Sequence, residues 1–448
     1  MRMLLSTKVM CSTFFNNCCL QLSYLANRFT SRVFFLCCFN TQHARKSYLR
    51  SKFSYAAVFL NLLFCFPLYA GSPEQAKRLH DRLAGVPADE ATLNQMVTLL
   101  DDHKAIEAAY LAMQSPDFYN TTLKLFATPW TNEQQDIFLP LNDYSATIIG
   151  MVRDDIDFRQ ILQSDIVYVG DNNLNLPAFS VSNNNHYQAL DDQFIDLSTN
   201  LVQVAQSSLN GLPTEATAGV LTSRAAAKSF FYLGTNRAML RFTLMNHLCT
   251  DLEPLKDNTL PPDRIRQDVS RSPGGDSRLF LNNCVACHSG MDPLAQAFAY
   301  YQYEFNTETD PNGDNGRLVY NTAGMIDSVT GTRVQAKYHN NNTTFPYGYI
   351  TRDDQWENYW RQGANRKLGW DNNISGKGQG AKSLGQELAN SHAFAQCQVK
   401  KVFQNVCLRS PQNEEDLNQI TTITASFKQN AYQLKRVFAE VGNYCMGE

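Results

Sequence analysis

The chain has 448 residues, with 39 Lys and Arg against 42 Asp and Glu, which gives a formal net charge of −3. The charge is unevenly spread, because residues 1–70 hold eight basic residues and no acidic one; residues 71–448 therefore carry a net charge of −11. An acidic chain lacks the basic surface on which nucleic-acid binding depends, so we expect no nucleic-acid partner. The length after residue 70 is enough for two or three hydrophobic cores.

Residues 1–70 are predicted to be a non-mature region that ends in a secretory signal peptide. Three basic residues between positions 46 and 52 precede an apolar run over 55–69, and the small residue Ala70 follows it. A basic segment, an apolar segment and a small-residue cleavage site occur in this order in signal peptides, here at about 46–70. The apolar run is short for a bilayer span, so membrane anchoring is the less favoured alternative. We therefore expect a protein that is soluble after cleavage and periplasmic or otherwise exported.

The segment 71–250 is predicted to be a helical domain. Apolar residues recur at helical spacing over 79–111, and a break at Gly85 separates short helices. The β-branched and aromatic run at 166–169 favours a short strand. A Pro-rich connector follows at 251–275, where we place the main domain boundary.

The last predicted domain, residues 276–448, begins with the most specific motif of the chain. Residues 284–288 read Cys-Val-Ala-Cys-His, the C-x-x-C-H spacing of covalent haem attachment. Two thiols three positions apart on a helical turn can each form a thioether with a haem vinyl group, and the adjacent imidazole can bind the iron. Chance would produce roughly 0.006 such motifs at this composition. We predict one covalent haem c held by Cys284 and Cys287, with His288 as the proximal iron ligand.

A zinc site or a redox dithiol is the alternative for these cysteines. Four-ligand zinc needs a second Cys or His pair nearby, which the sequence lacks, and a redox dithiol needs no adjacent His. A helix over 276–287 is expected to deliver the motif, with Phe280 packing under the haem-bearing turn as an aromatic residue usually does in c-type cytochromes. Asp292 and Pro293 are expected to end that turn, as the cap and the first residue of the next helix.

The sequence leaves the ligand on the other face of the iron open. Met325 lies 37 residues after His288, which is compatible with a loop that returns over the ring, and His339 is the main alternative. A Met or His ligand would make the iron six-coordinate and suit electron transfer, whereas a vacant position would allow chemistry on a small molecule. Met291 lies only three residues after the proximal His and is expected to belong to the core.

The remainder of the chain is predicted to be an irregular segment followed by a helical tail. Residues 306–380 are rich in Asn, Gly, Thr and Tyr and show little periodicity, which favours irregular structure with short strands. Helical spacing returns over 383–408, 413–428 and 430–444. The predicted fold class is therefore mostly α: an N-terminal helical region, a cytochrome c-like haem segment and a C-terminal helical tail.

Four cysteines after residue 70 are not used by haem: Cys249, Cys397, Cys407 and Cys445. In an oxidising compartment this even number favours two disulfide bonds. Cys397 and Cys407 are expected on one helix, about 15 Å apart at 1.5 Å per residue, which is too far for a bond between them. Two pairings remain, 249–397 with 407–445 or 249–407 with 397–445, and buried free thiols are the alternative to both.

The stretch 284–299, Cys-Val-Ala-Cys-His-Ser-Gly-Met-Asp-Pro-Leu-Ala-Gln-Ala-Phe-Ala, resembles a signature of the planctomycete-type cytochrome c domain proteins. In these proteins an apolar residue, Asp-Pro and a short apolar helix follow the haem motif, and positions 291–293 match that order. Ala295 stands where the family usually has Gly. The likeness extends in diffuse form over about 140–445, including Thr-Asn-Arg at 235–237. Most members have no assigned activity, so the resemblance implies covalent haem and export more than a reaction.

The leading interpretation is an exported mono-haem c-type cytochrome that exchanges electrons with a redox partner protein or enzyme. One alternative is a haem-dependent peroxidase- or oxidase-like enzyme with an open distal site. Another is a haem-bearing interaction module for an extracellular enzyme. The length of the chain favours these alternatives, because a one-electron carrier needs only about a hundred residues. The sequence does not decide whether the chain is an enzyme.

Overall fold

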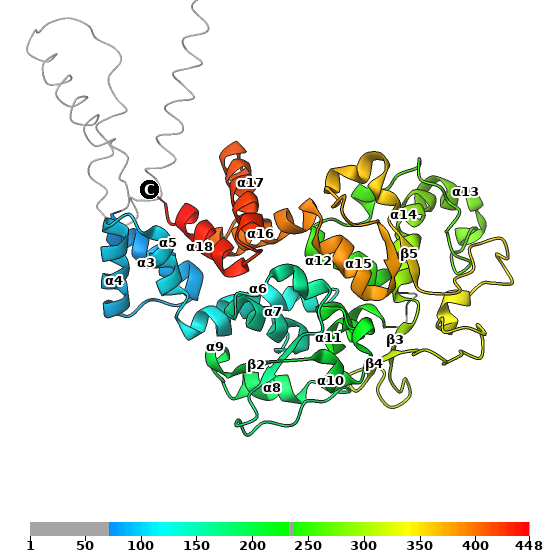
Figure 1. Cartoon of the computed structure of the whole chain (residues 1–448), viewed down its shortest axis with the longest axis horizontal. Helices are drawn as coiled ribbons and strands as arrows, with labels where there is room; N and C mark the ends of the chain where they lie inside the picture. Colours follow the sequence, from blue (N-terminus) through cyan, green and yellow to red (C-terminus); the bar gives the residue numbers. More distant parts are fainter. Residues whose placement is uncertain (1–70, 233, 235, 448) are drawn as a thin grey trace, which may run out of the picture. The chain divides into compact units, whose positions relative to one another are not determined.

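The computed structural model describes residues 71–232, 234 and 236–447, and the structural statements below refer to these residues. The predicted signal peptide at 46–70 lies outside them. The described residues belong to one compact unit, which runs from Tyr69 to Glu448. Helices dominate this unit and its strands are short (Figure 1), which confirms the prediction of a mostly α chain.

The first part of the unit is a series of short helices, as the spacing of apolar residues predicts. In the labels below, η marks a short 3-10 or π-helical turn. The elements of this part are α3 (Ser72–Ala84), α4 (Glu90–Asp101), α5 (Ala105–Ala112), η1 (Phe118–Leu123), α6 (Lys124–Ala127), η2 (Thr128–Thr131), α7 (Asp143–Arg153) and η3 (Phe158–Leu162). Gly85 ends α3 with a left-handed backbone (φ 78°), which glycine adopts without steric cost. Asp89 then starts α4 by accepting a hydrogen bond from the backbone N–H of Thr92.

A two-stranded antiparallel sheet and further short helices follow. The elements are β1 (Val167–Gly170), α8 (Asn185–Asp192), α9 (Leu197–Asn200), β2 (Leu201–Val204), α10 (Gln206–Asn210), η4 (Thr214–Ala216), η5 (Gly219–Thr222), α11 (Arg224–Phe230) and α12 (Arg237–Leu248). Strand β1 confirms the strand predicted at 166–169. It pairs antiparallel with β2, so that Val167 lies opposite Val204, and it packs on α7.

The Pro-rich segment and the haem segment come next. Their elements are η6 (Glu253–Leu255), η7 (Pro273–Gly275), α13 (Ser277–Leu279), η8 (Phe280–Cys284), α14 (Val285–Ala295), η9 (Gln296–Phe298), β3 (Tyr301–Glu304) and β4 (Arg317–Tyr320). Residues 251–275 are irregular apart from short helical turns and an isolated β-bridge between Arg266 and Tyr349. Helix α12 before this segment contacts α14 after it, and the domain boundary that we place here stays a prediction.

The final part contains irregular segments and then the helical tail. Its elements are η10 (Ala336–His339), β5 (Gln355–Glu357), η11 (Tyr359–Arg361), η12 (Gly363–Leu368), β6 (Lys377–Gln379), α15 (Gly380–Ala389), α16 (His392–Cys407), α17 (Glu414–Gln429) and α18 (Leu434–Cys445). The helical pattern at 383–408 is split into two helices rather than one. The break falls at Asn390, and the side chain of Ser391 caps α16 by accepting a hydrogen bond from the N–H of Phe394.

The two ends of the described unit share one core. Helix α18 lies beside α3 and α5 (Figure 1) and contacts both. The ring of Phe438 on α18 packs edge-on against Phe118 at 5.2 Å and against Phe126 at 5.3 Å, measured between ring centroids. No helix within the described part of the chain is long and apolar enough to cross a membrane.

Two disulfide bonds fix helix α16 to its neighbours. Cys249, just after α12, is bonded to Cys397 with a Cα–Cα distance of 5.2 Å, and Cys407 is bonded to Cys445 at 5.4 Å. Cys397 and Cys407 lie on the same helix, as predicted, and are not bonded to each other. The structure therefore selects one of the two pairings that the sequence leaves open.

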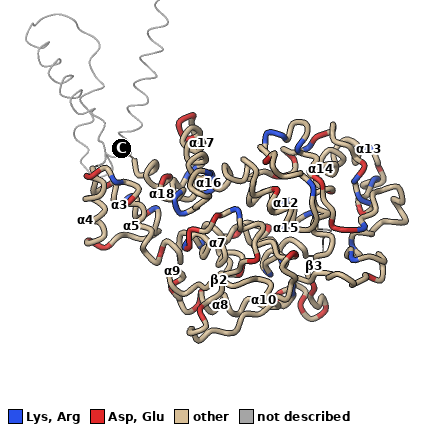
Figure 2. The backbone as a smooth tube through the Cα atoms, in the orientation of Figure 1, with Lys and Arg blue, Asp and Glu red and all other residues tan. Residues whose placement is uncertain are grey.

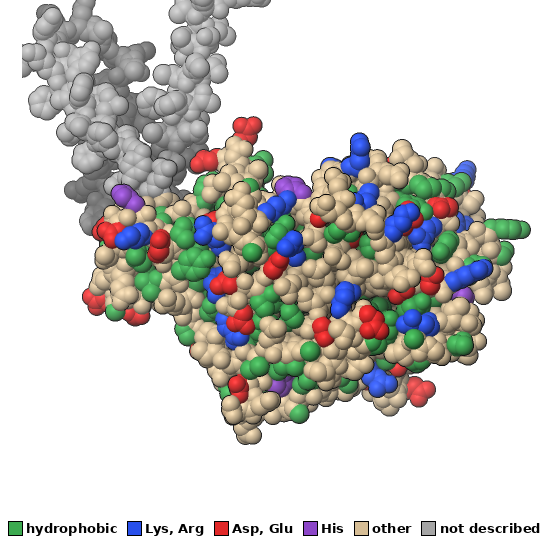
Figure 3. Space-filling model, viewed as in Figure 1, with side chains coloured by type: hydrophobic (Ala, Val, Ile, Leu, Met, Phe, Trp, Pro, Cys, Tyr) green, Lys and Arg blue, Asp and Glu red, His purple; other side chains and the backbone are tan. Residues whose placement is uncertain are grey.

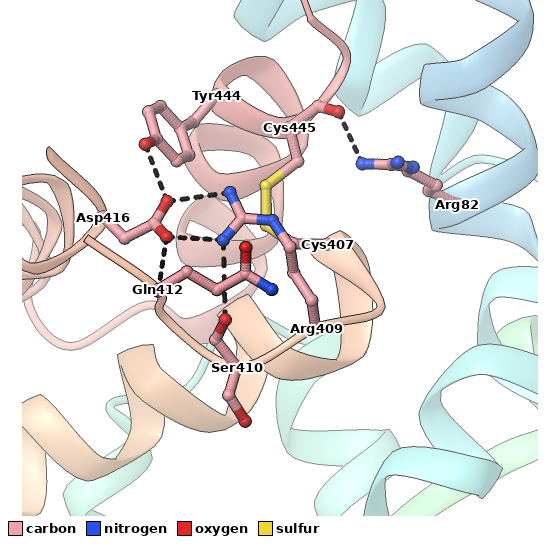
Figure 4. Close-up of a disulfide and its surroundings, with 8 residues drawn as sticks. All are labelled: Arg82, Cys407, Arg409, Ser410, Gln412, Asp416, Tyr444 and Cys445. Carbon is pink, nitrogen blue, oxygen red and sulfur yellow. Dashed lines mark hydrogen bonds and ion pairs between the residues drawn. A yellow bond between two sulfur atoms is a disulfide. The ribbon is translucent and has the colours of Figure 1, made fainter. Parts of the chain in front are cut away.

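An ion pair between a buried carboxylate and a partly exposed arginine accompanies the second disulfide (Figure 4). The Asp416 carboxylate has no exposed surface. It accepts hydrogen bonds from Arg409 Nη2, the Tyr444 hydroxyl and the backbone N–H of Gln412, each at 2.8 Å. The Arg409 guanidinium, opposed by burial, holds the pKa of Asp416 well below its ordinary value. This network joins the loop between α16 and α17 to α18.

Charges of both signs are interspersed over the described residues. Figure 2 shows Lys and Arg next to Asp and Glu around α14, and the face drawn in Figure 3 has small groups of either sign between polar and apolar side chains. A wide basic region is not present on that face among the residues the structure describes.

Candidate haem-binding site

The predicted haem motif lies where two helical segments join. Helix α13 begins after Asp276, which accepts a hydrogen bond from the N–H of Arg278, and the π-helical turn η8 then ends at Cys284. Helix α14 continues from Val285 through His288. The helix predicted over 276–287 is thus present, with one widened turn directly before the motif. Single π-helical turns inside helices occur frequently at functional sites.

Cys284 and Cys287 are the two described cysteines that take no part in a disulfide. Both are partly exposed, and burial raises the pKa of the Cys287 thiol. Their separation of three residues places them on one side of the helix. No group of three or more His, Cys, Asp or Glu able to hold a metal occurs among the described residues, so the zinc alternative lacks its ligands there.

An apolar cluster supports the turn from the inside. Phe280 is buried, and its ring centroid lies 6.2 Å from that of His288. Phe280 packs with Ile265 and Val269, and Cys284 lies against the same cluster. The aromatic residue predicted under the turn is therefore in that place. Its sequence neighbours Leu279 and Leu281 are 45% and 62% exposed, so apolar surface faces outward beside the two thiols.

The imidazole of His288 is hydrogen-bonded to Asp292, four residues later on α14. The distance from Nδ1 to Asp292 Oδ1 is 3.1 Å; the side chain of His288 is 18% exposed and that of Asp292 is fully buried. Burial by itself raises the pKa of Asp292, but Arg237 and the hydrogen bond from His288 lower it well below its ordinary value. Because the carboxylate is ionised, Nδ1 of His288 donates the hydrogen, which leaves the Nε2 lone pair to bind a metal.

Two arginines and a second carboxylate hold Asp292. Arg237 Nε donates to Asp292 Oδ1 at 2.7 Å, and the same guanidinium bonds to Asp268 at 2.8 and 2.9 Å. The backbone N–H of Arg266 donates to Asp292 Oδ2 at 3.2 Å, and its side chain pairs with Asp268 at 3.2 Å. Two positive and two negative groups therefore balance one another beneath the haem motif, and Asp268, Asp292 and the Arg266 side chain have no exposed surface.

The expectation that Asp292 and Pro293 end the turn is wrong. Helix α14 runs through both residues and ends at Ala295. Asp292 does not cap a helix, because its carboxylate is engaged by His288 and Arg237 instead. Pro293 removes one backbone hydrogen bond, which the helix tolerates in its last turn.

Neither predicted distal ligand contacts the haem motif in the described structure. Met325 is 49% exposed in the loop after β4, where its sulfur accepts a hydrogen bond from the backbone N–H of Thr322 at 3.3 Å. His339 Nε2 is hydrogen-bonded to the carbonyl oxygen of Thr351 at 2.8 Å. A distal role for Met325 stays a prediction. Met291 is buried in the main core, as predicted.

Sequence reasoning missed the charged network around His288. The His-x-x-x-Asp spacing on a predicted helix was a usable signal, since residues four apart share a helix face. Arg237 and Asp268 lie 55 and 24 residues from Asp292 in the sequence, so local patterns do not reveal their contact with it.

Comparisons of the chain with models of protein families, with curated proteins and with solved structures found no match. The likeness of 284–299 to a cytochrome c family signature therefore stays a prediction. The residues present fit a covalently attached haem: they offer two unpaired thiols at the right spacing, an imidazole with Nε2 available, and exposed apolar side chains beside them.

Proposed function

We propose that this chain is an exported mono-haem c-type cytochrome that transfers electrons to or from a redox partner. Haem would be joined by thioethers to Cys284 and Cys287, with His288 Nε2 on the iron. The observation that carries the proposal is the state of the cysteines: the C-x-x-C-H pair is unbonded and partly exposed, while every other described cysteine is in a disulfide. The resemblance to cytochrome c domain proteins supports the same function.

The bound haem would supply a one-electron ferric/ferrous couple, and the chain would set its position and surroundings. The two thiols anchor the ring to one helical turn, and Phe280 supports that turn from the core. Leu279 and Leu281 offer apolar surface that a ring edge could cover, which would keep water from that edge. Asp292 orients the imidazole of His288.

Export is part of the proposal, and the two disulfides support it. Such bonds form and persist in oxidising compartments and are rare in the cytosol. The bonds Cys249–Cys397 and Cys407–Cys445 join segments 148 and 38 residues apart in the sequence. A periplasmic or otherwise exported location, after removal of the predicted signal peptide, agrees with both the disulfides and the chemistry of haem attachment.

The test is expression of the full chain with a c-type haem maturation system, followed by the optical spectrum of the reduced protein. We expect a c-type α-band that survives denaturation, because the haem is covalent. The variant C284A/C287A should lack it, whereas C249A/C397A, which removes the other kind of cysteine pair, should retain it. Colourless exported protein with alkylatable Cys284 and Cys287 would refute the proposal.

A haem enzyme acting on peroxide or oxygen is a second candidate, and the His288–Asp292 contact favours it. A carboxylate on the proximal imidazole makes that ligand a stronger electron donor, which helps iron to activate a small oxidant. This candidate requires an open distal position. It predicts high-spin ferric iron that binds cyanide without displacing a protein ligand; a low-spin six-coordinate spectrum would exclude it.

A further inference from the structure

We propose that Asp292 is a positioning residue that holds His288 with its hydrogen on Nδ1 and increases the donor strength of Nε2, so that the haem favours the ferric state. This inference rests on the proposed haem site. It adds that the chain lowers the reduction potential of the haem. It also explains the buried ion network around Asp292, which covalent attachment of haem does not require.

The geometry leaves Asp292 little freedom. Its Oδ1 accepts from His288 Nδ1 at 3.1 Å and from Arg237 Nε at 2.7 Å. Its Oδ2 accepts from Arg237 Nη2 and from the backbone N–H of Arg266, at 3.1 and 3.2 Å. With four donors on two oxygens, the carboxylate cannot turn away from the imidazole without losing a charge-assisted hydrogen bond. The orientation of His288 is thereby fixed.

The fold delivers Arg237 to this place by an unusual start of α12. Asn236 has a left-handed backbone (φ 64°), and its buried side-chain amide donates to the carbonyl oxygens of Phe298 and Tyr301 at 2.6 and 2.8 Å. These bonds tie the beginning of α12 to the chain that follows α14. Arg237, the first residue of α12, then reaches across to Asp292.

Burial determines how strongly Asp292 acts on its neighbour. Asp292 and Asp268 have no exposed surface, so solvent screens their interactions little. The charges of the two arginines, Arg237 and Arg266, cancel those of the two aspartates at a distance. One Asp292 oxygen nevertheless accepts a hydrogen bond directly from the imidazole. That oxygen draws the Nδ1 hydrogen toward itself and increases the electron density that Nε2 can donate. A stronger donor on the iron stabilises the ferric state, which carries one more positive charge than the ferrous state, and so lowers the midpoint potential.

The test is the midpoint potential of the full-length holoprotein in three variants. D292N keeps the shape of the side chain but removes its charge, and we expect the ferrous state to gain about tenfold relative to the ferric state, an upward shift of about 59 mV. D268N keeps the contact of Asp292 with His288 and weakens only its support, so a smaller upward shift is expected. If D292N yields no holoprotein, the midpoint potential of D268N still tests the inference.

The matched control is E387Q. Glu387 is a buried carboxylate on α15 that accepts hydrogen bonds from Arg361 at 2.7 and 2.8 Å and from Asn358 at 2.6 Å, with no contact to the haem motif. Its loss should lower stability without moving the potential. If haem is attached and the potentials of D292N and D268N equal those of E387Q and the parent, the inference is overturned while the proposed function stands. Absence of covalent haem in the parent refutes the proposed function instead.

Discussion

The turn with the C-x-x-C-H motif at 284–288 and the C-terminal corner, where Asp416 lies beside the Cys407–Cys445 disulfide, contain similar groups in different states. Each combines a pair of cysteines with a buried Asp that is held by an Arg: Asp292 with Arg237 near the motif, and Asp416 with Arg409 beside Cys407–Cys445. In the corner the cysteines are bonded to each other, and the remaining donors to the carboxylate are a tyrosine hydroxyl and a backbone N–H.

At the C-x-x-C-H turn neither thiol is in a disulfide, and the carboxylate is hydrogen-bonded to an imidazole. A buried Asp paired with an Arg is therefore not by itself a sign of function, because it occurs in both regions. What separates them is that one region keeps two partly exposed thiols out of any disulfide, next to an imidazole that is held by the buried carboxylate. The following changes test this distinction.

The largest contrast is expected between the two cysteine pairs. C284A/C287A should abolish covalent haem and leave folding largely intact, because neither thiol closes a loop. C407A/C445A should keep the haem but lower the free energy of unfolding by about 2–4 kcal/mol, as expected for loss of a disulfide. Haem content by absorbance and urea unfolding of each variant measure the two effects. Equal haem loss in both variants would contradict the distinction.

The ion pair of the C-terminal corner should matter for stability alone. D416N leaves the partly exposed Arg409 and the Tyr444 hydroxyl without their charged partner, and we expect a loss of about 1 kcal/mol. The optical spectrum of the haem should not change. Thermal unfolding monitored by circular dichroism gives the first quantity, and a shifted haem spectrum in D416N would show that the corner is coupled to the site.

Two glycines allow the packing of the regions to be compared. A Cβ on Gly290 of α14 would lie 2.1 Å from Nε1 of the buried Trp360, whereas one on Gly442 of α18 would lie 2.9 Å from the flexible end of Leu79. G290A should therefore cost about 1–3 kcal/mol and disturb the turn that carries His288. G442A should cost less, since the Leu79 side chain can move aside. Equal losses in urea unfolding would contradict this ranking.

The smallest effects should appear as opposite responses to pH. Asp354 directly precedes strand β5, which contacts α14. Burial raises the pKa of Asp354 to about 6, so the folded state holds a proton that the unfolded state releases above pH 3.8. Its contribution to stability is present below pH 3.8 and is lost as the pH rises to about 6, with a slope of at most about 1.4 kcal/mol per pH unit.

The lowered pKa of Asp416 gives the reverse sign, because its contribution is present above pH 3.8 and is lost as the pH falls below that value. The free energy of unfolding in urea should be measured from pH 3 to pH 7. D354N should remove part of the decrease in stability toward higher pH, and D416N should remove part of the decrease toward lower pH. The same slope change in both variants would be inconsistent with these assignments.

Local patterns in the sequence predicted the features that depend on neighbouring residues alone. Helical spacing located the helices, and C-x-x-C-H located the unbonded cysteines. The 1.5 Å rise of a helix excluded a Cys397–Cys407 bond, but the choice between the two remaining pairings depends on how α12 and α18 pack against α16, which no local pattern records. The split at Asn390 had a signal in Ser391, a good helix cap, that the apolar spacing on both sides concealed.

The role of Asp292 was missed for a related reason. Proline at the next position favours the start of a helix, whereas the His-x-x-x-Asp spacing favours a contact within one helix, and the two signals conflict. The structure resolves the conflict through a distant residue: Arg237 neutralises Asp292 inside a helix that would otherwise bury an unpaired charge. Contacts of this kind join segments far apart in the sequence and become visible only in the folded chain.

Mass spectrometry of the peptide that contains residues 284–288, taken from protein exported by a host with c-type haem maturation, tests the assignment most directly. The peptide should carry the mass of one haem, with neither Cys284 nor Cys287 open to alkylation. Recovery of that peptide without haem and with both cysteines alkylated, or joined to each other as a disulfide, would contradict it.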